Sequence, residues 1–65
     1  MKEWEIRVLE IEQKAIAKFG LKQYLTMLSV LSGRKVSTID RFFDRGLVPS
    51  LSIYCDLLEI VDTAN

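Results

Sequence analysis

Histidine is absent from this 65-residue chain, and cysteine and proline each occur once. Without histidine the chain lacks the commonest metal ligand and general base. No glycine-rich phosphate loop, cysteine cluster or catalytically spaced pair of carboxylates is found in it either. The sequence therefore predicts a protein that is not an enzyme and that uses neither a cofactor nor a metal. The single cysteine, Cys55, cannot close an internal disulfide. It falls in an apolar run, so we expect a buried structural thiol.

Long apolar runs are also missing, since no stretch approaches the ~20 residues that a membrane-spanning helix needs. The segment Met1–Glu5 does not have the pattern of a signal peptide. These features predict a soluble, cytoplasmic protein without a membrane partner. A chain of 65 residues allows one domain, 1–65, with a small core, and its 49% apolar content is typical of a globular protein.

The formal net charge is zero, but the charges are unevenly distributed. Residues 18–50 carry six basic and two acidic side chains, whereas residues 51–65 carry three acids and no base. The local field of a surface, more than its total charge, determines whether it attracts phosphates. The positive central segment is thus a candidate for contact with nucleic acid, and an ordinary solvated surface is the alternative.

Apolar residues at spacings of three and four predict four helices, with Gly20 and Gly46 ending the first and third and Ser50 capping the fourth. Their expected ranges are 1–19, 21–32, 36 or 37 to 45, and 51–61. We expect Leu28 and Leu31 to face the core with Val30 beside them, and Glu10 to pair with Lys14. The expected inward residues of the first helix are Trp4, Val8, Ile11 or Ala15, and Phe19. Those of the third are Ile39 and Phe42, with Phe43 as a further candidate.

The centre of the chain has the pattern of two helices joined by a tight turn. Gly33 is expected at positive φ, because such a turn needs a conformation that glycine adopts without steric cost. Ser37 and Asp40 have the spacing of a capping box at the start of the second helix. Two helices, a glycine turn and a polar second helix together form a helix-turn-helix pattern.

The run from Gly33 to Ile39, followed by Asp40-Arg41-Phe42, Gly46 and Pro49-Ser50-Leu51-Ser52, resembles the Cro/CI-type, lambda-repressor-like helix-turn-helix family. In that family a Ser-Thr-Ile run opens the recognition helix after the turn glycine, a second glycine ends it, and a Pro-Ser-Leu run opens the next helix. The match covers residues 25–61. The resemblance implies an all-α bundle of four or five short helices around a central helix-turn-helix, and a bacterial, phage or plasmid-type regulator that binds double-stranded DNA.

If the family's docking geometry applies, the helix at about 36–45 enters the major groove with its N-terminal end toward the bases. Arg41 is the first candidate for reading a base, because a guanidinium can bind O6 and N7 of guanine together. By position, Lys35, Ser37 and Thr38 are the next candidates. Arg34 and Arg45 are expected to hold phosphates, as is Gln23 at the start of the preceding helix.

The C-terminal helix is apolar on two sides, which is more apolar surface than one small core needs. The excess suggests a homodimer through this helix, which would suit a palindromic site. The alternative function is a protein-interaction module, such as an antirepressor or a partner-binding subunit, that keeps the fold without binding DNA. Asp40 and Asp44 favour this alternative, because phosphates repel carboxylates.

Overall fold

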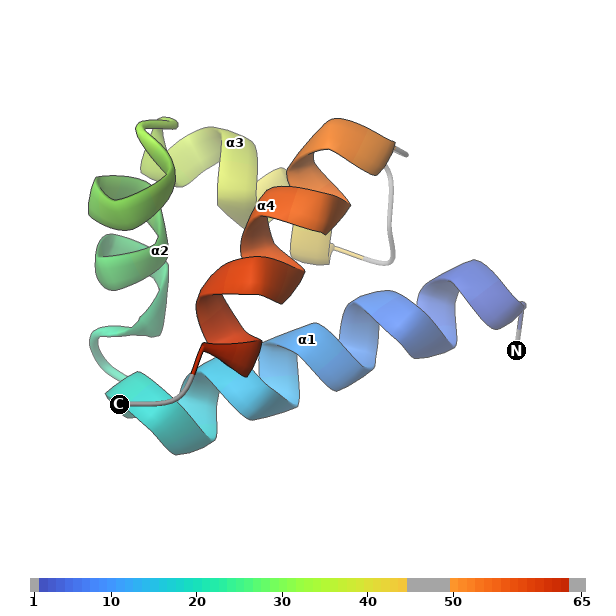
Figure 1. Ribbon diagram of the computed structural model, residues 1–65, viewed down its shortest axis with the longest axis horizontal. Coiled ribbons are helices and arrows are strands. Elements are labelled where there is room, and N and C mark those ends of the chain that lie inside the picture. The colour runs from blue at the N-terminus through green and yellow to red at the C-terminus, as the bar shows by residue number, and fades with distance from the viewer. Residues whose placement is uncertain (1, 45–49, 64–65) are drawn as a thin grey trace.

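The computed structural model describes residues 2–44 and 50–63, which form four helices and, within these ranges, no strand (Figure 1). The helices are α1 (Glu3–Phe19), α2 (Tyr24–Ser32), α3 (Val36–Phe43) and α4 (Leu51–Asp62). The prediction of a small all-α bundle is therefore confirmed. The expected start of the first helix at Met1 lies outside the described residues.

Two predicted helix ends are confirmed by their hydrogen bonds. Gly20 ends α1 with φ 94°, and its N–H donates to the carbonyl of Ile16 at 2.8 Å. Ser50 caps α4 by accepting a hydrogen bond from the N–H of Ile53 at 3.3 Å. These ends were predictable because a cap depends on one residue and its nearest neighbours along the chain.

The predicted start of the second helix at Leu21 is wrong by three residues. The N–H groups of Gln23 and Tyr24 both donate to the carbonyl of Gly20, at 3.2 and 3.0 Å, so residues 21–23 form a turn before α2 begins. This turn changes the chain direction after α1, so that α2 runs across α1 (Figure 1). As a result α2 can pack back against α1.

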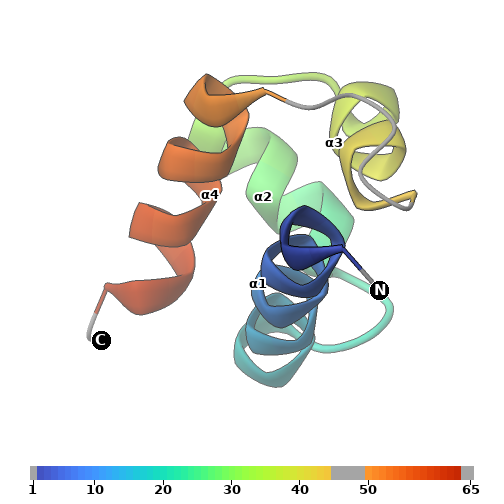
Figure 2. The same ribbon diagram turned by 90° about the vertical axis from the view of Figure 1, so that its right-hand side faces the viewer.

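The core collects side chains from all four helices. Trp4 from α1 lies at its edge, with its ring 5.9 Å from Phe42 of α3 and 5.5 Å from Tyr54 of α4. In Figure 2, α3 and α4 lie on opposite sides of α1 and α2. The buried residues are Val8, Ile11, Ala15, Leu28, Ile39, Phe42, Phe43, Ile53 and Leu57. Most of the predicted inward residues of α1 and α3 are thereby confirmed.

Three predicted core positions are wrong. Leu31 and Val30 of α2 are 53% and 71% exposed, because Leu28 takes the inward position of that helix. Cys55 is exposed. It lies two residues from both Ile53 and Leu57, which are buried, and a helix turns by about 100° per residue, so Cys55 faces away from the core.

The predicted ion pair between Glu10 and Lys14 is not formed. Lys14 instead contacts Asp62 near the end of α4, with Nζ 3.1 Å from Oδ1. On the part of the chain that the structure describes, no helix has both the length and the apolar character to cross a bilayer.

Candidate nucleic-acid interface

The turn between α2 and α3 is built around Gly33, which adopts φ 71° and ψ 20° as predicted. The carbonyl of Ser29 accepts hydrogen bonds from the N–H groups of Gly33 at 3.0 Å and Arg34 at 3.2 Å. The Ser29 hydroxyl in turn donates to the carbonyl of Arg34. Ser29 therefore ties both sides of the turn together. The sequence does not reveal this role, because a hydroxyl in an apolar helix gives no sign of its partner five residues away.

The start of α3 differs from the predicted capping box. The N-cap is Lys35, whose side chain makes no capping hydrogen bond, and Ser37 is already the second residue of the helix. A capping hydroxyl must precede the first helical residue, so Ser37 does not cap α3. The helix also ends earlier than predicted, at Phe43 with Asp44 as C-cap. The expected end at Arg45 and Gly46 lies outside the described residues.

The two faces of α3 differ sharply. Ile39, Phe42 and Phe43 are buried and hold the helix against α1 and α2. Ser37 and Arg41 are four residues apart and therefore lie one above the other on the opposite, exposed face. Exposed residues of α3 and its ends also include Lys35, Val36, Asp40 and Asp44, whereas Thr38 is half-buried.

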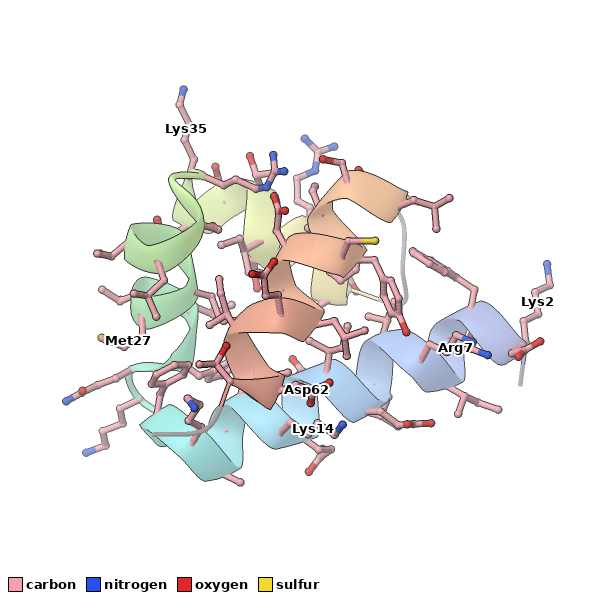
Figure 3. All side chains as sticks on the ribbon, viewed as in Figure 1. Lys2, Arg7, Lys14, Met27, Lys35 and Asp62 are labelled. Carbon is pink, nitrogen blue, oxygen red and sulfur yellow. The ribbon has the colours of Figure 1, made fainter. Side chains whose placement is uncertain are left out.

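Lys35 projects away from the bundle where the turn meets α3 (Figure 3). Gln23 is exposed at the N-cap of α2, and its carbonyl accepts a hydrogen bond from Met27 N–H at 2.9 Å. The next residue, Tyr24, has its ring 6.0 Å from Phe43. The structure thus brings the start of α2 beside the end of α3. Arg45, the remaining predicted contact, lies outside the described residues.

Arg34 is engaged within the protein. Its Nη2 lies 2.6 Å from Oδ2 of Asp56 and 3.1 Å from Oγ of Ser52, both on α4. Its side chain is 29% exposed. The sequence could not reveal this pair, because Arg34 and Asp56 are 22 residues apart along the chain.

Folding partly cancels the charge separation seen along the sequence, because acids of α4 lie against bases from the preceding helices and turn. Asp56 pairs with Arg34, and Asp62 pairs with Lys14. On α3 and its ends, the two bases Lys35 and Arg41 are balanced by Asp40 and Asp44.

The acidic groups near the start of α2 also affect Tyr24. Burial, a hydrogen bond of 2.9 Å to Oε2 of Glu12 and the negative charges of Glu12 and Asp40 raise the pKa of Tyr24 to about 12. The Tyr24 hydroxyl is therefore a neutral donor at any ordinary pH. The hydrogen bond from Tyr24 to Glu12 joins α2 to α1, on helices against which α3 packs.

The residues 2–44 and 50–63 contain no group of three or more metal-ligating side chains. Comparison of the chain with protein-family models, with curated proteins and with solved structures gives no match. The candidate interface therefore rests on the geometry of the turn, the exposed face of α3 and the start of α2.

Proposed function

We propose that the chain is a small sequence-specific transcriptional regulator that binds double-stranded DNA through the exposed face of α3. The observation that carries the proposal is the arrangement around Gly33. A tight turn presents a short helix whose inner face is buried and whose outer face carries Ser37 and Arg41. A helix held in this way can enter the major groove, since the groove is wide enough for one helix.

Within this proposal the side chains have different roles. Arg41 reads a guanine, and Ser37, Thr38 and Lys35 at the projecting start of α3 are the next candidates for reading neighbouring bases. Arg34 is a weaker candidate than the sequence suggests. To bind a phosphate its guanidinium must first leave Asp56.

A single short helix reads few base pairs, so we propose that a homodimer binds a palindromic site, with α4 contributing to the dimer surface. The excess apolar surface of α4 is smaller than predicted, because Tyr54, Leu58 and Val61 pack against the core.

The second candidate function, a protein-interaction module, is favoured by the balanced charge on α3. Asp40 and Asp44 both face solvent, and phosphates repel both. Carboxylates on a reading helix can still accept from the amino group of cytosine. The two functions differ in salt dependence, because DNA affinity falls steeply with salt and an apolar protein interface is much less sensitive.

Selection of binding sites from random duplexes tests the proposal, followed by titration of the selected and a random duplex at several salt concentrations. Arg41→Ala should cost ~1–3 kcal/mol on the selected site and relax one base position per half-site. Arg45→Ala should weaken binding to both duplexes alike and lower the salt slope by about one per protomer. Lys2→Ala removes a charge at the far end of α1 and serves as the control (Figure 3).

Equal loss on both duplexes for Arg41→Ala would make Arg41 a phosphate contact and move base reading to Lys35, Ser37 or Thr38. Failure of the wild-type protein to bind any duplex at low salt would refute DNA binding. The interaction module would then be the better explanation.

A further inference from the structure

Helix α2 has no charged residue along its nine positions, although 28% of the whole chain is charged. One side of α2 faces the core, through the buried Leu28 with Tyr24 and Leu25 partly buried beside it. Large apolar residues that group on an exposed surface mark a site of interaction with a partner. The outer side of α2 has this character.

That outer side forms an apolar ridge of Met27, Val30 and Leu31, which are spaced three and four residues apart and so share one face. Val30 is 71% exposed and Leu31 is 53% exposed. The Met27 side chain points away from the bundle (Figure 3). We call these three residues the α2 ridge.

A groove lies directly beside the ridge, between α2 and α4. One part, of about 340 Å³, is lined by Leu31, Ser32, Asp56, Glu59, Ile60 and Thr63. It continues, through the shared residues Leu31, Ile60 and Thr63, into a part of about 300 Å³ that also includes Lys18 and Phe19. We call the two parts together the α2–α4 groove.

We propose that the α2 ridge and the α2–α4 groove form the interface with a second copy of this chain. A two-fold contact needs a surface that fits itself, so that each copy offers what the other requires. The α2 ridge and the α2–α4 groove lie side by side on one molecule, because Leu31 belongs to both. One copy can place its ridge in the groove of the other and receive the partner's ridge in return.

The charges along the groove support the same occupant. Glu59 lines one part and Lys18 lines the other, whereas Asp56 in the first part is already paired with Arg34. When two copies pack with their grooves antiparallel, Glu59 of each copy lies at the end of the interface that holds Lys18 of its partner. Such complementary charges favour this register and disfavour the parallel one, in which like charges would meet.

This interface is compatible with the proposed function and does not rest on it. In Figure 2, α3 and α4 lie on opposite sides of α1 and α2, so a partner on the α2–α4 groove approaches from the side of α4. The exposed face of α3 belongs to the other side. The dimer should form without DNA, which makes it testable even if the chain binds no duplex.

The test is sedimentation equilibrium of the full chain without DNA, over concentrations from about 1 µM to 1 mM, a range suited to a small interface. The wild type should form dimers. Val30→Asp should raise the dimer dissociation constant about a hundredfold or more, because it places an unpaired charge in the apolar contact. Leu51→Asp is the matched control, because Leu51 is 72% exposed but lies outside the ridge and groove. It should dimerise like the wild type.

A second pair of variants tests the antiparallel register. Glu59→Lys should weaken the dimer, and adding Lys18→Glu should restore it, because the double variant exchanges the two charges. A monomeric wild type at all concentrations would overturn the proposal. The proposal would also be overturned if Val30→Asp and Leu51→Asp weakened the dimer equally while circular dichroism showed an intact fold in both. A double variant that dimerises no better than Glu59→Lys alone would overturn the antiparallel register.

Discussion

The pair between Arg34 and Asp56 provides the sharpest test of the fold, because it joins the helix-turn-helix turn to α4. We consider replacing Asp56 by Asn, which keeps the shape and removes the charge, and Arg34 by Met, which keeps the apolar stem. The two atoms in contact lie 2.6 Å apart. The Nε of Arg34 is buried and has no hydrogen-bond partner among the described residues. The guanidinium therefore depends on Asp56 and Ser52 for its interactions.

The expected coupling free energy between Arg34 and Asp56 follows from how far their side chains are exposed. Exposed pairs contribute about 0.2–1 kcal/mol, whereas removing one partner of a fully buried pair costs about 3–5 kcal/mol. The side chains of Arg34 and Asp56 are 29% and 46% exposed, so we expect a coupling free energy of about 1 kcal/mol. Asp56→Asn should cost more than Arg34→Met. It leaves the more buried charge without a counter-charge, whereas Arg34→Met leaves an aspartate that water can solvate.

Urea unfolding of the wild type, both single variants and the double variant gives this coupling as a double-mutant cycle. The pair between Lys14 and Asp62 is the internal control. Its side chains are 51% and 50% exposed, so its coupling should stay below about 0.5 kcal/mol. An Arg34–Asp56 coupling no larger than that of the control pair would contradict this dependence on exposure. So would a greater loss of stability for Arg34→Met than for Asp56→Asn.

Three further predictions concern single residues. Gly33→Val should destabilise the fold by about 1 kcal/mol or more in thermal unfolding, because valine is strained at the positive φ of this position. Steric overlap does not contribute, since a Cβ at residue 33 would meet no atom within 4 Å. Gly33→Asn should cost less, because asparagine tolerates positive φ better. Cys55 should react with a thiol reagent in the native protein almost as fast as in urea, and strong native protection would contradict its exposed position. The pKa of Tyr24 is raised on folding from 10.0 to about 12, so its contribution is complete below pH 10 and is lost as the pH rises toward 12. Tyr24→Phe should therefore show a shallower loss of stability across that range, and equal slopes would refute the assignment.

The sequence by itself determined the features that depend on neighbouring residues. Gly20 and Gly33 adopt positive φ and Ser50 caps α4, because a helix end is decided by a few adjacent backbone groups. The spacing of Ile39 and Phe42 predicted the buried face of α3 for a similar reason, since helical periodicity fixes which residues share a face. Even the local signals had limits. Ser37 and Asp40 match a capping box, yet α3 begins one residue before Ser37.

The tertiary structure decided what depends on how the helices pack. Both sides of α2 and of α4 are apolar enough to be buried, and only the position of the other helices selects Leu28 over Val30, or Leu57 over Cys55. Arg34 and Asp56 are 22 residues apart along the chain, so no local sequence pattern shows that they pair. The sequence therefore made Arg34 look free to bind a phosphate. The ridge on α2 and its groove arise in the same way, because Leu31 and Ile60 become neighbours only when α2 packs beside α4.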